Sequence, residues 1–452
     1  MRGNRDIYVS FDTIIMVTLF VCLSIEFVLL FFDSELFNFQ AKLSIILGLF
    51  LLIVCVKRSI GGYPFKLFTI FLILYFVQRI ILLSIDPAYF DFPIHLDETD
   101  INHALLFLFF SSITILMGFS FGIALSSLER LRKQSYLNYG IFKTNSYRKT
   151  WIKISYVILF AHLFVLLFLK QGFGVIPAGE FSWMLRPIRV WQLMFGVNIL
   201  LLMQSHIKFV NSEKKALKVF IVLSVGAMII SGSRAALFSI PFAIIMAKFI
   251  IGDFRVKAKT IILLSLLIPF LSVYFTFINA YRGILQQSYA DPSVTRSIDY
   301  YDLLNRINMI DSINFLSVRM NGFDLLVAAL KKQDELSNYL NIKDSVLTIV
   351  DSLYPGSLFE HAIEPAQVIP TVLRNVDMSA FIFSGEHLNL IAMSFIYLGY
   401  FGGFIFLFIF SFITALVLFS KKDVVIKLII VNILIFYTFE TGFIESIVQN
   451  LS

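Results

Sequence analysis

The chain has 452 residues, of which 58% are hydrophobic, only 15% are charged and 51 are phenylalanines. Soluble domains are about 45–50% apolar and about 25% charged, so a mean hydropathy of +0.84 excludes a soluble enzyme and a disordered chain. The two cysteines, Cys22 and Cys55, lie inside apolar runs and exclude a disulfide scaffold. The composition therefore indicates a polytopic membrane protein, in which the position of the net charge of +7 matters more than its size.

Segments of about 20 mostly apolar residues are long enough to cross a bilayer as helices. The sequence predicts an all-α membrane protein with eleven spans. The spans cover residues 13–32, 41–56, 65–85, 104–125, 152–169, 189–205, 217–233, 235–251, 260–280, 390–419 and 424–447. The first span has no small-residue cleavage site, so we expect a signal anchor rather than a removed signal peptide.

The distribution of lysine and arginine predicts the orientation. If the N-terminus is cytoplasmic, the cytoplasmic segments contain 22 Lys and Arg residues, whereas the outer loop 86–103 contains none. We therefore expect the N-terminus in the cytoplasm and the C-terminus outside.

One long segment, residues 281–388, contains no span and is predicted to lie outside. It separates a membrane domain of residues 1–280 from a second membrane part, residues 389–452. With 8 basic and 13 acidic residues it is net acidic, which argues against a nucleic-acid partner. Apolar residues at helical spacing predict amphipathic helices over 298–319 and 323–331, which we expect to lie on the membrane surface as a cap.

Arginine is unusually frequent in the predicted outer segments. The outer segments contain eight arginines and five lysines, and the cytoplasmic segments contain seven arginines and 15 lysines. The outer arginines are Arg186, Arg189, Arg234, Arg282, Arg296, Arg306, Arg319 and Arg374. Because a guanidinium binds phosphate or carboxylate through two N–H groups, the bias favours an outward-facing site for an anionic ligand. Ordinary ion pairs with the acidic groups of the long segment are the alternative.

Four charged residues near the ends of spans or inside them are candidates, two for binding an anion and two for an ion pair. Arg234 lies in the turn Ser231-Gly232-Ser233-Arg234, and Arg282 follows span 9, so both are expected at the depth of lipid phosphates. Interfacial snorkelling is the alternative for both. Arg79 and Glu26 lie inside predicted spans and could pair with each other.

Candidate bases precede span 10 in the sequence Gly385-Glu386-His387-Leu388-Asn389. His and Glu are common general bases for a hydroxyl group, and a span of 30 residues would hold its first turns above the bilayer. A second pair, Glu360 and His361, lies in the long segment. Helix caps or loop hydrogen bonds are the alternatives. No phosphate-binding loop, zinc helix or serine nucleophile elbow is found, and 97–100 (DETD) is either a metal or catalytic site or, more simply, a solvated acidic loop.

These residues together resemble the bacterial O-antigen (oligosaccharide repeat-unit) polymerases of the Wzy type, which are related to the O-antigen ligases. Three features carry the resemblance: Ser-Gly-Ser-Arg at 231–234, the large outer segment with Arg282 and Arg306, and His387-Leu388-Asn389 followed nine residues later by Gly399-x-x-Gly402. The sequence departs from the family in the extra leucine between His and Asn, and in Met393 where many polymerases have an acidic residue.

The resemblance implies a glycosyltransferase of the bacterial inner membrane, with residues 281–388 in the periplasm, that uses neither a nucleotide cofactor nor a metal. Its donor would be an oligosaccharide on undecaprenyl diphosphate, its acceptor a sugar hydroxyl of another lipid-linked repeat, and a chain-length regulator a possible partner. The implied catalytic residues are His387, Glu386, Arg234 and Arg282. The implied substrate-binding residues are Arg306, Arg319, Tyr281, Glu360 and His361.

Three other functions remain open at this stage. An O-antigen ligase would transfer the glycan to lipid A-core. A lipid-linked single-sugar transferase would use acidic residues in its first outer loop, where 33–35 (DSE) is the only candidate. A flippase or transporter would place charged groups at the membrane midplane and show related halves, and the sequence has no visible repeat.

Overall fold

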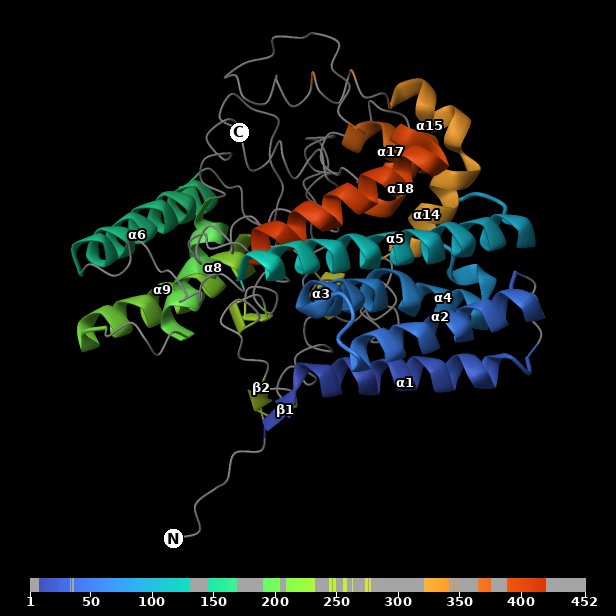
Figure 1. Cartoon of the computed structure of the whole chain (residues 1–452). Coiled ribbons are helices and arrows are strands. Elements are labelled where there is room, and N and C mark those ends of the chain that lie inside the picture. The colour runs from blue at the N-terminus through green and yellow to red at the C-terminus, as the bar shows by residue number, and fades with distance from the viewer. Residues whose placement is uncertain are drawn as a thin grey trace, which may run out of the picture. The chain divides into compact units, whose positions relative to one another are not determined.

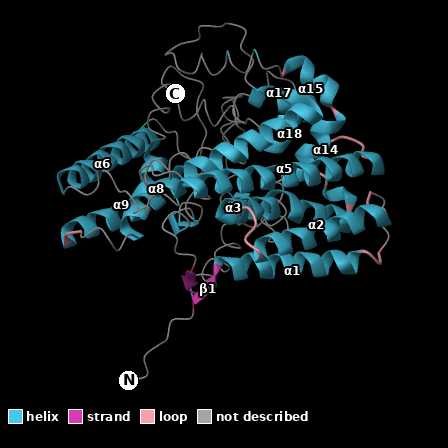
Figure 2. Ribbon diagram, in the orientation of Figure 1, coloured by secondary structure: helices cyan, strands magenta, loops and turns pink. Residues whose placement is uncertain are grey.

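The computed structural model describes residues 8–32, 36–130, 145–168, 190–203, 209–231, 255–257, 321–340, 365–374 and 388–419, with a few isolated positions (Figure 1). The chain divides into two compact units. One comprises residues 1–9 and 139–319, and the other comprises residues 10–138 and 320–452. The described residues of both units are almost entirely helical (Figure 2).

Among its described residues, the second unit contains five helices that are long and apolar enough to cross a membrane. They are α1 (Phe11–Leu29), α2 (Phe39–Lys57), the continuous helix Gly62–Ile85, residues Glu98–Ser126 of α5 (Glu98–Arg130), and α18 (Leu390–Phe419). The third of these consists of α3 (Gly62–Leu72), a π-helical turn η1 (Ile73–Val77) and α4 (Gln78–Ile85). Many large apolar side chains on α1, α2 and α5 are exposed, as expected of helices that face lipid. The chain is therefore a helical membrane protein.

Five of the eleven predicted spans thus match these helices. Three more, at 152–169, 189–205 and 217–233, coincide with α6 (Asn145–Phe168), α8 (Val190–Met203) and α9 (Asn211–Ser231), which are not among the five. The spans predicted at 235–251, 260–280 and 424–447 lie outside the described residues, apart from isolated positions.

Helix caps fix where the apolar helices begin. The Ser10 side chain accepts a hydrogen bond from the Thr13 amide at the start of α1, and Asn38 does the same for Ala41 at the start of α2. Such caps satisfy backbone N–H groups that have no partner within the helix. Asn38 also donates to Glu98, so the starts of α2 and α5 lie at the same end of this unit.

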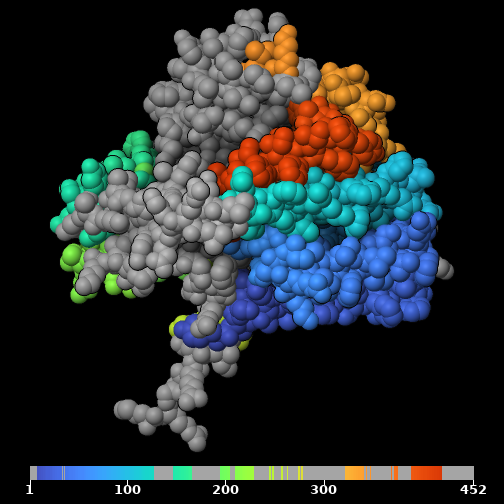
Figure 3. Space-filling view, viewed as in Figure 1, coloured from blue at the N-terminus to red at the C-terminus, as the bar shows by residue number. Residues whose placement is uncertain are grey.

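α5 and α18 pack against each other over most of their length (Figure 3). Gly118 and Gly122 of α5 face the backbone of α18, where a Cβ on Gly118 would lie 2.5 Å from the Phe408 carbonyl oxygen. Ser411 and Ala415 are the opposing side chains. Small residues four positions apart on both helices allow this close approach, which membrane helices use because apolar burial alone does not hold them together in lipid.

α18 is broken at Gly399, where φ is 66° and ψ is −170°. A Cβ on Gly403 would lie 3.0 Å from the Ser394 carbonyl oxygen, although these residues are nine positions apart. In a continuous helix they would be separated by about 13 Å along the axis, so the chain turns back at Gly399. The expectation of one continuous 30-residue helix is therefore wrong, and with it the argument that its first turns stand above the bilayer. Instead, residues 390–396 are buried, and 400–419 has the length of about one membrane crossing.

The predicted helix at 323–331 is confirmed as α14 (Gly322–Lys331), but its expected position on the membrane surface is wrong. All residues from 322 to 329 are buried, and α14 packs against α5, α18 and the π-helical turn. A Cβ on Gly322 would lie 2.8 Å from the carbonyl oxygen of Tyr75. Tyr75 is about 15 Å from Ile85, the last residue of the third apolar helix, measured along the helix axis. α14 therefore enters the bundle, as non-helical and short segments can at membrane depth when protein surrounds them.

Two further helices of this unit precede α18 in the chain. α15 (Gln333–Tyr339) follows α14 directly, and α17 (Pro365–Arg374) packs against α15. A short 3₁₀ helix, η2 (Pro87–Tyr89), lies in the connection between α4 and α5.

In the first unit, α6, α8 and α9 pack together through polar contacts as well as apolar ones. Trp151 donates to Asn198 at 2.8 Å, and Asn198 donates to Ser155 at 3.2 Å. The Tyr156 hydroxyl donates to the Ala216 carbonyl at 2.8 Å. A two-stranded sheet pairs β1 (Tyr8–Ser10) with β2 (Arg255–Lys257).

Candidate functional site

All nine site residues named from the sequence lie outside the described residues. They are His387, Glu386, Arg234, Arg282, Arg306, Arg319, Tyr281, Glu360 and His361. The structure does describe the residues on either side of the Glu386-His387 pair, namely Arg374 and Asn389. Both belong to a buried polar network that sequence reasoning did not anticipate.

The network is built around an ion pair between Arg79 and Asp324. The two side chains are almost completely buried, with 1% and 0% of their surface exposed. The guanidinium donates through Nε to Asp324 Oδ1 at 3.0 Å and through Nη2 to Asp324 Oδ2, and Nη2 also donates to the Tyr89 carbonyl. The predicted pairing of Arg79 with Glu26 is therefore wrong, because α14 brings a carboxylate to Arg79 inside the bundle.

The surroundings of Asp324 shift the pKa of its carboxyl group in opposite directions. Burial raises the pKa of the Asp324 carboxyl, and the guanidinium of Arg79 and the backbone N–H of Asp91 counteract that rise. A buried carboxylate is tolerated only when it is paired and hydrogen-bonded. The three N–H donors meet that requirement.

Asp91, in the connection between α4 and α5, joins the other members of the network. Its carboxylate accepts from Asn321 Nδ2 and from Arg374 Nη2, each at 2.6 Å. Its carbonyl oxygen accepts from Arg374 Nη1 at 2.9 Å, and the Arg374 guanidinium lies over the Phe92 ring. Arg374 is one of the eight arginines of the predicted outer segments, and its charge is used in an ion pair within the protein. Its partner is Asp91 of the loop 86–103, not an acidic group of the long segment as the alternative expected.

Asn389 anchors the start of α18 to α14. Its side-chain nitrogen donates to the Gly322 carbonyl at 3.0 Å, and its side-chain oxygen accepts from the Ala392 amide at 3.0 Å as a helix cap. The side chain is buried. Asn389, which the sequence placed in a catalytic pattern, is thus a structural anchor, and Met393 one turn later is buried.

The acidic stretch at 97–100 forms the N-cap of α5. The Asp97 carboxylate accepts from the Asp100 amide, and the Asp100 carboxylate accepts from the Asp97 amide, both at 3.0 Å. This reciprocal arrangement is a capping box. Hydrogen bonds from the Thr99 side chain and the Asp100 amide lower the pKa of Asp97. Lys331, at the end of α14, pairs with Asp100 at 2.5 Å.

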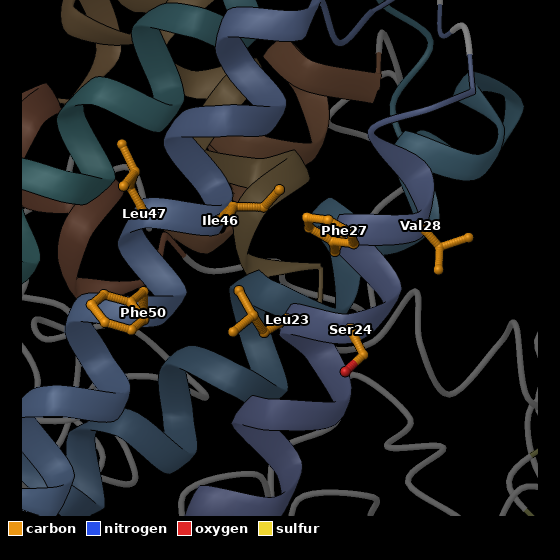
Figure 4. A pocket seen from close by; sticks show the side chains of 7 residues that line it. All are labelled: Leu23, Ser24, Phe27, Val28, Ile46, Leu47 and Phe50. Atoms are coloured by element: carbon orange, nitrogen blue, oxygen red, sulfur yellow. The ribbon is translucent and has the colours of Figure 1, made fainter.

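Neither a metal site nor a catalytic pocket is found in the part of the chain that the structure describes. No group of three or more His, Cys, Asp or Glu side chains could hold a metal ion there. A groove between α1 and α2 is lined by Leu23, Ser24, Phe27, Val28, Ile46, Leu47 and Phe50 (Figure 4). Its one polar side chain, Ser24, donates to the Phe20 carbonyl of its own helix. The groove therefore offers an apolar surface for lipid chains and no chemistry.

Comparisons with known proteins do not identify the chain further. No protein family model, no curated protein and no solved structure matches it. The fold and the buried network therefore define its class, a helical membrane protein with a short helix inserted into the bundle, and its activity has to be inferred from its residues.

The network escaped sequence reasoning because its members are far apart in the chain. Arg79 and Asp324 are separated by 245 positions. One signal was available, because Asp324 lies between Phe323 and Leu325 in the otherwise apolar sequence of α14. A charged residue in such a position requires a buried partner of opposite charge, and Arg79 was the arginine already noted inside a span.

Proposed function

We propose that the chain is a membrane glycosyltransferase that polymerises undecaprenyl-diphosphate-linked oligosaccharide repeat units at the periplasmic face of a bacterial inner membrane. The sequence bias toward arginine in the predicted outer segments is the observation that carries this proposal. A lipid diphosphate at the headgroup level of the outer leaflet is the anionic leaving group that such arginines would bind.

In the proposed reaction, a sugar hydroxyl of the acceptor attacks the anomeric carbon of the donor glycan. The bond between that carbon and the diphosphate oxygen breaks, and undecaprenyl diphosphate leaves with the bonding electrons. Arg234, Arg282 and Arg306 would stabilise the charge that develops on the diphosphate, an effect worth several kcal/mol in a sheltered site. His387, with Glu386 beside it, would accept the hydroxyl proton. Arg319, Tyr281, Glu360 and His361 would bind the sugars.

The buried network supports the proposal by fixing the long predicted periplasmic segment to the membrane helices. Asp324 of this segment is held by Arg79, Arg374 is held by Asp91, and Gly322 is held by Asn389. A glycosyltransferase of this kind has to hold its polar groups at the membrane boundary while a long lipid-linked substrate is bound. Anchors on both sides of residues 375–388 would limit where Glu386 and His387 can lie.

A transporter for a lipid-linked glycan is the second candidate, and one observation favours it. α18 is discontinuous at Gly399, and α14 begins deep beside the third apolar helix. Broken helices and short inserted helices near mid-depth are typical of transporter binding sites. The buried charges Arg79 and Asp324 satisfy each other, however, so they do not present a free charge to a substrate.

The proposal is tested by deleting the gene from its host and complementing with the Arg234→Ala variant. Loss of the polymerase should leave single-repeat lipopolysaccharide and remove the ladder of longer chains on a gel. The matched control is Arg58→Ala, at the exposed end of α2 on the predicted cytoplasmic side, which should restore the ladder. Immunoblotting checks that both variants reach wild-type amounts.

The outcomes separate the candidate functions. A ladder that persists unchanged in the deletion strain contradicts the polymerase proposal. If even the single repeat disappears, a ligase or a transporter is favoured, because the loss of either protein would prevent the glycan from reaching lipid A-core.

A further inference from the structure

Glu26, on the buried face of α1, is a carboxyl group that the proposed function does not use. It has no exposed surface, and neither of its oxygens has a hydrogen-bond partner among the described residues. It lies on the same helix face as Leu19 and Cys22, which packs against α2, α3 and α4. An ionised carboxylate at such a place would lack every donor that burial requires.

The nearest cation, Lys42 of α2, is directed elsewhere. Its side chain is 2% exposed, and its ammonium donates to the carbonyl oxygens of Leu29, at 3.0 Å, and Phe32. These two carbonyls belong to the end of α1 and the connection that follows it. The ammonium therefore closes the turn between α1 and α2 and forms no ion pair within 4.0 Å with a described carboxylate.

The other charged or titratable groups near α1 are also accounted for. On α4, Arg79 is paired with Asp324. On α3, Lys66 pairs with Asp12 at the opposite end of α1. Cys22 lies one turn before Glu26 on α1 itself. The acidic residues of the turn, at positions 33 and 35, lie outside the described residues.

From this geometry we propose that Glu26 is a protonation site inside the membrane bundle. With the proton bound, the carboxyl is neutral and Lys42 holds the turn through its two carbonyl partners. When the proton leaves to water, the carboxylate attracts the Lys42 ammonium, and the Leu29 and Phe32 carbonyls lose a donor. Proton binding at Glu26 thus controls how firmly the α1–α2 turn is closed. This inference does not depend on the glycosyltransferase proposal.

Infrared difference spectroscopy of the purified full chain in phospholipid bilayers tests the site directly. At a pH where exposed carboxyls are ionised, the wild type should show the carbonyl-stretching band of a protonated carboxylic acid, and the band should be lost on raising the pH. Glu26→Gln should lack the band. Glu26→Asp, which keeps a carboxyl group, and the double variant Asp33→Asn/Glu35→Gln should retain it. Equal band areas in the wild type and Glu26→Gln would overturn the proposal.

Hydrogen exchange tests the coupling to Lys42. At each pH, exchange of the turn backbone at 30–38 is compared with Glu26→Gln, so that the intrinsic effect of pH on exchange cancels. The wild type should match Glu26→Gln while the proton is bound and exchange faster once the infrared band has gone. Equal exchange at every pH would refute the coupling between the proton and the turn.

Discussion

Replacing Arg79 by methionine should destabilise the helical bundle by about 3–5 kcal/mol, because it leaves the carboxylate of Asp324 buried without its guanidinium. The change removes two hydrogen bonds to Asp324 and a third to the Tyr89 carbonyl. The Asp91 amide would be the remaining donor to Asp324 among the described residues. Since about 1.4 kcal/mol corresponds to a factor of ten, the folding equilibrium should shift by roughly two to four orders of magnitude.

The free energy of unfolding can be measured by titrating the full chain in mixed micelles with sodium dodecyl sulfate and following the helical circular dichroism. The matched control is Lys66→Met, which removes an ion pair whose acid, Asp12, has a side chain that is 46% exposed. The Lys66 side chain is only 10% exposed, but the Asp12 carboxylate that the change leaves behind is accessible to water and stays hydrated. The control should therefore lie close to the wild type.

The double variant Arg79→Met/Asp324→Leu separates the cost of an unpaired charge from the loss of the pair itself. Apolar residues of similar size often replace a buried ion pair with little loss of stability. The double variant should therefore be more stable than Arg79→Met alone. A double variant that is at least as unstable as the single one would refute this account of the network.

Two further variants test the backbone and the cap. Gly399→Ala should destabilise the bundle by about 1–3 kcal/mol in the same titration, because the φ and ψ angles of Gly399 suit only glycine. The control Gly48→Ala, whose added Cβ would meet nothing within 4 Å, should be neutral or slightly stabilising. Equal effects of the two variants would contradict the turn at Gly399. The hydrogen bonds to Asp97 lower its pKa from 3.8, so they stabilise the folded state above pH 3.8, and this stabilisation is lost as the pH falls through the lower folded-state value. The melting temperature of the wild type should therefore fall more steeply with acidification below that pH than that of Asp97→Asn, and parallel curves would show that the cap does not contribute.

The apolar helices were predictable because a membrane span is a strong local signal. The predicted spans 13–32, 41–56, 65–85 and 104–125 overlap the observed helices closely, and the bounds 390–419 match those of α18. About 20 apolar residues in sequence have few other stable structures in a bilayer. Composition and periodicity, both local properties, were sufficient for this part of the fold.

The break in α18 and the burial of α14 were not predictable from the same signal. An apolar run of 30 residues has the same hydropathy whether it forms one helix or two. Gly399 and Gly402 were noted only as a family-like pattern, yet Gly399 permits the chain to turn back on itself. α14 has the length and amphipathic pattern of a surface helix, and its burial depends on Arg79. The contact across 245 positions leaves no local signal beyond the acidic residue inside the apolar helix.

The candidate site was predictable only in part, since sequence reasoning located charged residues but not their partners. Arg374 was counted as a potential anion ligand, and its contacts with Asp91 and Phe92 show a role within the fold. Asn389 was assigned to a catalytic pattern, and its contacts make it a cap and an anchor. The charge bias that motivates the proposed function therefore rests on the remaining outer arginines.

The buried network also implies an order of assembly. Burial of Arg79 without Asp324, or of Asp324 without Arg79, would destabilise the bundle, because either charge would be buried without compensation. We therefore expect the insertion of α14 to be most favourable once α4 and the connection carrying Asp91 are in place. Asp91 binds both Asn321 before α14 and Arg374 at the end of α17. The same insertion thus fixes the near end of the segment that carries Glu386 and His387, so the proposed base would reach its working position only after the membrane helices have packed.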